Sequence, residues 1–101
     1  MARCPRTVAE AFERLDKRLS EEEKKSIKEA KDMIEFHFDL GMWIRNNWFF
    51  RGEKENVNLL LQELGEKVSF DNESGTLFFI GGADEFSSSV LEAYQKHLKE
   101  E

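Results

Sequence analysis

The sequence contains one cysteine and one proline, and each shortage limits the structures that the chain can form. Cys4 is the one cysteine, so an internal disulfide and a cysteine-based zinc cluster are both excluded. We expect its thiol to be free, close to a frayed N-terminus and in a reducing compartment. Pro5 is the one proline, and it prevents a helix from starting upstream of the pattern that follows it.

Long hydrophobic runs are missing as well. The longest apolar-looking run, residues 33–44, contains Glu35, His37 and Asp39, whereas a bilayer-spanning helix needs about 20 apolar residues. The first residues pass directly into a polar amphipathic pattern without the features of a signal peptide. We therefore expect a cytoplasmic protein with no membrane span.

Motifs for catalysis and for cofactor binding are scarce. No serine is framed by glycines as in a nucleophile elbow, and Gly81-Gly82 lacks the glycine spacing and the lysine of a phosphate-binding loop. Glu35, His37 and Asp39 diverge around a helix, so at most two of them reach the same metal ion. We expect no metal and no cofactor. An enzyme is not favoured, although His37 leaves general acid–base chemistry open.

Aromatic and acidic residues, in contrast, are plentiful. The 101 residues include nine phenylalanines and two tryptophans, and 40% of the chain is hydrophobic, which supports one folded domain over residues 1–101. The formal net charge is −6, and residues 33–101 hold thirteen acids against six bases. Such a surface repels phosphate backbones, so nucleic acid is not expected as a partner. It suits a basic protein partner, and it equally suits ordinary solubility.

Apolar residues recur at helical spacing in five segments of the chain. Two expected helix starts have capping-box spacing, Thr7 with Glu10 and Ser20 with Glu23. Gly52 is expected to end the third segment. The predicted helices cover residues 7–19, 20–30, 31–48 and 54–64, and a last helix starts at Asp84 or Ser87. We expect His97, near the end of that last helix, to face solvent. The pattern does not decide whether the second and third helices are continuous.

Between residues 67 and 80 the pattern changes to that of strands. Two β-prone runs, 67–70 and 76–80, flank a polar loop with a late glycine, as in a β-hairpin. The predicted fold class is therefore α+β: a mostly helical single domain of four to five helices, with one β-hairpin packed on the helices. Phe78 and Phe79 are adjacent and cannot both point inward, so they form a candidate interface.

The central segment, residues 31–48, has apolar residues in almost every direction around a helix, so we expect other elements to surround it. Gly41 lies in its middle, where glycine costs about 1 kcal/mol relative to alanine. His37, Gly41 and Arg45 share one stripe, with Trp48 three residues further on. The stripe indicates either a notch that holds an anionic group or a structural cluster. In the second case Asp84 or Asp39 neutralises Arg45.

The run His-x-x-Leu-Gly-x-x-Ile-Arg-Asn at residues 37–46, followed by Trp48, resembles a family of small bacterial proteins of unknown function. A second, weaker match is the start of the last helix at 84–87 with Tyr94, His97 and Leu98. The chain departs from the family pattern at 49–51. The resemblance implies no activity, but it implies that the two motifs lie together. The candidate polar site is therefore His37, Gly41, Arg45, Asn46, Trp48, Asp84 and Ser87.

Two functions are compatible with these features. The favoured one is a small cytoplasmic protein-binding or regulatory module that docks on another protein through an acidic and aromatic surface. Its basis is the small size, the acidic charge and the missing catalytic set. The alternative is a small enzyme or ligand binder in which the notch between His37 and Arg45 holds an anionic group.

Overall fold

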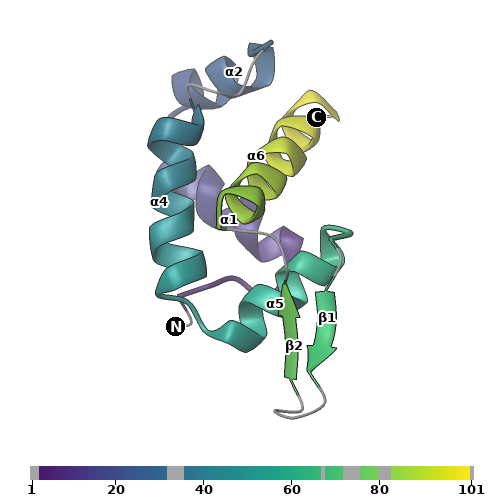
Figure 1. Ribbon diagram of the computed structural model, residues 1–101. Coiled ribbons are helices and arrows are strands. Elements are labelled where there is room, and N and C mark those ends of the chain that lie inside the picture. The colour runs from purple at the N-terminus through teal and green to yellow at the C-terminus, as the bar shows by residue number, and fades with distance from the viewer. Residues whose placement is uncertain (1–2, 32–35, 67, 72–75, 80–82, 101) are drawn as a thin grey trace.

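The computed structural model describes residues 3–31, 36–66, 68–71, 76–79 and 83–100. For His37 and for both strands the description covers the backbone and not the side chains, and Glu35 and Gly81-Gly82 lie outside it. Five helices and two short strands follow one another along this part of the chain (Figure 1). Their bounds are α1 Val8–Arg18, α2 Glu21–Glu29, a central helix made of η1 His37–Gly41, α4 Met42–Ile44 and η2 Arg45–Phe50, then α5 Lys54–Glu63, β1 Val68–Asp71, β2 Thr76–Phe79 and α6 Ala83–Glu100.

The first two helices begin where their capping residues predict. The Thr7 hydroxyl accepts a hydrogen bond from the Glu10 N–H at 3.1 Å. At the start of α2 the bonds are reciprocal, because Ser20 Oγ accepts from the Glu23 N–H and the Glu23 carboxylate accepts from the Ser20 N–H, each at 3.1 Å. Ala30 is extended (ψ 130°) and ends α2, so α2 does not run on into the central helix.

The central helix is wider than an α-helix over most of its length. η1 and η2 have the i→i+5 backbone bonds of a π-helix, and they flank the short α4. Gly41 has φ −60° and ψ −43°, values that any residue adopts, so backbone freedom does not explain a glycine there. The helix ends at Phe50, just before Gly52 as expected.

Helix α6 organises the core. It packs against η1 and η2 of the central helix and against α2, and Figure 1 shows it running from the centre of the molecule to the upper right, with the hairpin below it. None of the described helices is both long and apolar enough to cross a bilayer. The largest fully buried apolar side chains include Leu15, Ile27, Ile44, Trp48, Leu60, Leu61, Phe86, Val90, Leu91 and Tyr94.

The predicted α+β class is wrong, because the architecture is that of a helical domain. Among the side chains that the structure describes, which do not include those of the strands, the buried apolar ones lie in helices apart from Cys4, Pro5 and Leu19. β1 and β2 pair antiparallel, with Val68 opposite Phe79, and they contact α5. A ribbon of two four-residue strands is too small to form a layer of its own, so helix packing defines the class.

The N-terminal segment is held in place, which corrects the expectation of a frayed terminus. Cys4 is 0% exposed, and burial next to the Glu53 carboxylate raises the pKa of its thiol to about 12. The Glu53 carboxylate accepts hydrogen bonds from the N–H groups of Cys4 (3.1 Å) and Arg3 (3.2 Å). These backbone bonds, that of Cys4 first, lower the pKa of Glu53. Asn56 Nδ2 donates to the Cys4 carbonyl at 3.2 Å.

Candidate functional site

Arg45 and Asp84 form the centre of the predicted polar site. Arg45 lies at the start of η2 and Asp84 in the first turn of α6, and these two elements pack together. Arg45 Nη1 donates to Asp84 Oδ1 at 2.5 Å. The Arg45 side chain is 26% exposed and that of Asp84 is 83% exposed. Asp84 also benefits from its position at a helix N-terminus, where a negative charge is stabilised.

Ser87 completes the first turn of α6. It is buried, and its Oγ donates to the backbone carbonyl of Asp84 at 3.0 Å. This bond fixes the turn that presents the Asp84 carboxylate to Arg45. The Ser87 hydroxyl and the Asp84 carboxylate are therefore both hydrogen-bonded to other groups of the chain.

Three other predicted site residues, Gly41, Asn46 and Trp48, make no described contact with this cluster. Trp48 is buried and contacts Trp43 edge to face, with ring centroids 5.7 Å apart. Asn46 is exposed, and Gly41 is buried within the helix. His37 opens η1, but its side chain lies outside the described part of the structure. Of the predicted set, the structure thus brings together Arg45, Asp84 and Ser87.

The chemistry available at this cluster is limited. The carboxylate of Asp84 already balances the charge of Arg45, and among the described residues the buried Nε of Arg45 has no hydrogen-bond partner. An ion pair with one exposed carboxylate links two helices, and that carboxylate is held by the guanidinium of Arg45. Among the described residues, no group of three or more His, Cys, Asp or Glu is placed to hold a metal ion.

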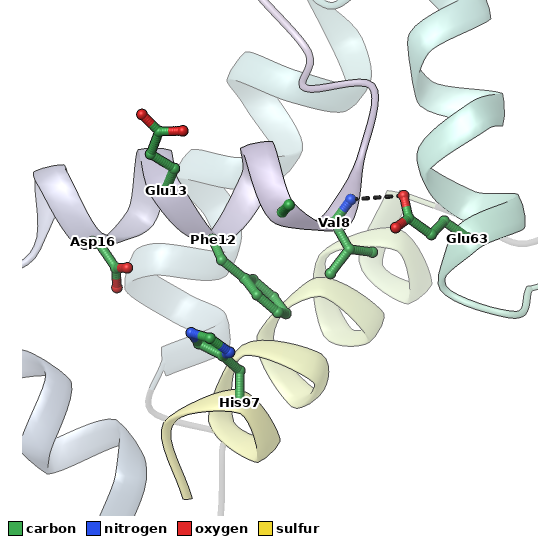
Figure 2. Close-up of a pocket in the computed structure, with 7 residues that line it drawn as sticks. Val8, Phe12, Glu13, Asp16, Glu63 and His97 are labelled. Atoms are coloured by element: carbon green, nitrogen blue, oxygen red, sulfur yellow. Dashed lines mark hydrogen bonds between the residues drawn. The ribbon is translucent and has the colours of Figure 1, made fainter. Parts of the chain in front are cut away.

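A groove along α1 is a second place where polar and aromatic side chains meet (Figure 2). His97 was expected to face solvent, but its ring stacks on Phe12 with centroids 4.5 Å apart. Glu63 accepts from the Val8 N–H at 2.8 Å, and Asp16 accepts from Tyr94 Oη at 2.6 Å. The groove has a volume of about 580 Å³ and is lined by Val8, Ala9, Phe12, Glu13, Asp16, Glu63 and His97. The Glu63 carboxylate thus links α5 to α1, and the Asp16 carboxylate links α1 to α6. These two acidic groups of the groove stabilise the fold.

The outer face of the central helix is the feature that sequence reasoning missed. Phe38 is 74% exposed, Phe50 is 64% exposed and Met42 is 41% exposed, and Asn46 is exposed between them. We name these four residues, Phe38, Met42, Asn46 and Phe50, the outer stripe. Residues four apart lie on nearly the same side of a helix, so the outer stripe is continuous.

The inner face of the same helix explains why the outer stripe is uncovered. Leu40, Ile44 and Trp48 are also four apart, and they are buried. Each is two positions from an outer-stripe residue and therefore points to the opposite side. The expectation that other elements surround this helix is wrong, because it forms one side of the molecule (Figure 1). The polar Asn46, at i+4 from Met42, was the signal in the sequence for an exposed face.

Neither the curated proteins nor the solved structures contain a match to the chain. A family described as a domain of unknown function, DUF6794, matches residues 4–98. The expectation of an uncharacterised family is confirmed at that level. The match extends from the buried Cys4 to the last turn of α6 and so spans all five helices, and the chain therefore belongs to the DUF6794 family.

Proposed function

We propose that this chain is a small protein-binding module that docks through the outer stripe of its central helix. The observation that supports this is the exposure of Phe38, Met42 and Phe50 on one helix face. Moving apolar surface out of water is favourable by about 25 cal/mol per Å². Aromatic residues and methionine are enriched in interfaces, so this face has a reason to be covered by another chain.

The proposal changes the expected docking surface from acidic and aromatic to apolar. The candidate interface residues Phe78 and Phe79 belong to β2, whose side chains lie outside the described part of the structure. The acidic groove along α1 has carboxylates that already bind groups of the chain itself. The outer stripe, in contrast, consists of large side chains with high exposed fractions.

The alternative function, a ligand binder that holds an anion between His37 and Arg45, has less support. A buried guanidinium requires an anion, and Asp84 supplies one at 2.5 Å. The requirement that motivated an external anionic ligand is thus met inside the fold.

Site-specific photocross-linking in cells tests the proposed function. A benzoyl-phenylalanine would replace Phe38 or Phe50 in turn, and Leu59 of α5 serves as the matched control because it is a large apolar residue, 40% exposed, outside the outer stripe. We expect discrete cross-linked protein adducts from positions 38 and 50, and little from position 59. Equal, diffuse labelling at all three positions would contradict docking through the outer stripe.

A further inference from the structure

We propose that the chain docked on the outer stripe is a second copy of this protein, with the two central helices antiparallel about a two-fold axis. This inference rests on the proposed function and names the partner of that surface. A two-fold interface uses the same patch on both copies, so the patch must be complementary to itself. The outer stripe satisfies this requirement in its apolar residues and in its charges.

The order of residues along the outer stripe is nearly symmetric. Aromatic residues, Phe38 and Phe50, stand at its two ends, and Met42 and Asn46 stand between them. With the axis opposite Ile44, antiparallel pairing places Phe38 of one copy against Phe50 of the other and Met42 against Asn46. The Asn46 amide then lies against Met42 of the other copy inside an aromatic-ended patch, and four phenylalanines are removed from water.

The same two-fold rotation also brings opposite charges beside the outer stripe toward one another. Asp39 and Arg51 each follow an end phenylalanine by one residue, and both are exposed. Each is therefore one position further round the helix than that phenylalanine, with Arg51 as the residue that caps η2, and a two-fold axis brings corresponding sides of the two helices together. With the axis opposite Ile44, Asp39 of one copy lies opposite position 49 of the other, two residues from Arg51. This offset is about 3 Å along the helix, within the reach of an arginine side chain, so the two charges approach each other twice per dimer.

A hollow at the Asp39 end of the outer stripe can receive this arginine. Its volume is about 250 Å³, and it is lined by Arg18, Leu19, Glu23, Asp39, Leu40 and Trp43. Arg18 is occupied, because its guanidinium stacks over the Trp43 ring at 4.0 Å. The Glu23 carboxylate already accepts the Ser20 N–H at 3.1 Å, so Asp39 is the carboxylate of this hollow that remains for a guanidinium arriving from outside.

Local charge favours a second copy over a basic protein. The chain carries a net charge of −6, but residues 37–51 contain one acid, Asp39, and two bases, Arg45 and Arg51. Arg45 is paired with Asp84, which leaves one charge of each sign beside the outer stripe. A basic partner would be drawn to the acidic regions elsewhere, whereas this balanced face does not repel its own copy.

The size of the outer stripe determines how tight the dimer is. Its exposed side chains present on the order of 350 Å² of apolar surface, taking about 200 Å² for each large side chain. A standard interface buries about 800 Å² per partner. We therefore expect a reversible dimer with a Kd in roughly the micromolar range rather than a permanent one.

Sedimentation equilibrium of the full chain, from roughly 1 to 500 µM at neutral pH, measures this association. We expect wild type to pass from monomer to dimer, and Phe38→Asp and Phe50→Asp to raise the Kd at least about tenfold. Leu59→Asp is the matched control and should leave the Kd within about twofold. Circular dichroism melting verifies that each variant is folded.

A charge swap tests the antiparallel arrangement and does not depend on the phenylalanine variants. Asp39→Arg alone and Arg51→Asp alone each place like charges opposite one another, so both should weaken the dimer, about threefold or more. The double variant restores opposite charges and should recover most of the wild-type affinity. Failure of the double variant to recover would overturn the antiparallel pairing.

The two proposals fail in different ways. A chain that stays monomeric over the whole concentration range, or a dimer that Phe38→Asp and Phe50→Asp leave intact, overturns the second copy as the occupant. If photocross-linking at positions 38 and 50 then gives adducts with a different protein, docking through the outer stripe still holds. If no such adducts form, both proposals are wrong.

Discussion

A methyl group added at Gly52 would meet the chain from two sides. Its ideal Cβ position is 2.1 Å from the Trp48 carbonyl oxygen and 2.6 Å from Cys4 Cβ. One neighbour is backbone and the other belongs to a buried residue, so neither can move away cheaply. Gly52 thus allows the N-terminal segment to pass close behind the end of the central helix.

We expect Gly52→Ala to lower the free energy of unfolding by about 3 kcal/mol, the upper range for overpacking a filled site. Urea denaturation measures the change. Gly65→Ala is a useful control, because a Cβ there meets nothing within 4 Å but the backbone has φ +86°. Its expected cost is about 1–2 kcal/mol, from conformation alone. A Gly52→Ala protein with an unchanged urea midpoint would contradict the close approach.

Cys4 makes stability depend on alkaline pH. Its pKa is raised from 9.0 to about 12 in the folded state, so between these values the folded chain holds a proton that the unfolded chain loses. Stability is therefore fully present below pH 9 and is lost as the pH rises toward 12. Lysine and tyrosine also titrate in this window, so the comparison must be made against a variant.

We expect wild type to lose more stability between pH 9 and pH 12 than Cys4→Ala does, as measured by urea midpoints at each pH. The same burial should make the thiol react with Ellman's reagent only as fast as the chain unfolds. Rapid modification of the folded protein at pH 8 would show that the N-terminal segment is not held as described.

At the scale of elements, α6 holds the other helices through polar side chains as well as apolar ones. Gln95 Nε2 donates to the carbonyl of Ala30 (2.8 Å), just past the end of α2, and to that of Ile27 (2.9 Å), which also accepts from the Ala30 N–H (3.3 Å). Tyr94 Oη donates to Asp16 on α1. A hydrogen bond from the Ser89 hydroxyl to Glu66 ties α6 to the segment after α5. The Arg45–Asp84 pair adds the central helix to this set.

A double-mutant cycle with Arg45→Ala and Asp84→Ala measures what that pair contributes. We expect a coupling energy of about 1 kcal/mol or less, because Asp84 is 83% exposed and water screens the pair. Arg45→Ala alone should cost more than Asp84→Ala alone, because the stem of the better-buried Arg45 also packs against the helices. A coupling energy above about 3 kcal/mol would instead indicate a buried ion pair.

At the scale of the whole molecule, local signals in the sequence were sufficient to predict where the helices lie along the chain. They were insufficient to predict which faces of those helices other elements cover. Capping residues and apolar spacing predicted α1 and α2 because those interactions join neighbours in the chain. Charge indicated Asp84 or Asp39 as the partner of Arg45, the family resemblance implied that the Asp84 corner lies beside it, and the structure has Asp84 in that place. Which side of the central helix faces water depends on where α6 and α2 pack, and apolar residues on every side could not show that.

The remaining errors have the same origin. Cys4 is placed by Glu53 and Asn56, about fifty residues further along the chain, and His97 is placed by Phe12 on α1. Composition and periodicity carry no information on such distant pairs. The fold class was wrong for a related reason, since the size of a β element relative to the helical core is decided by tertiary packing.

The burial of Cys4 also makes the chain convenient for spectroscopic labelling. Its side chain is fully enclosed and its thiol stays protonated at neutral pH. A cysteine introduced at an exposed position such as Leu59 would therefore react selectively in the otherwise native chain. A nitroxide spin label placed in this way would report the distance between two copies by pulsed electron resonance. Cys4, which fits beside Gly52 because that residue has no side chain, would not have to be replaced first.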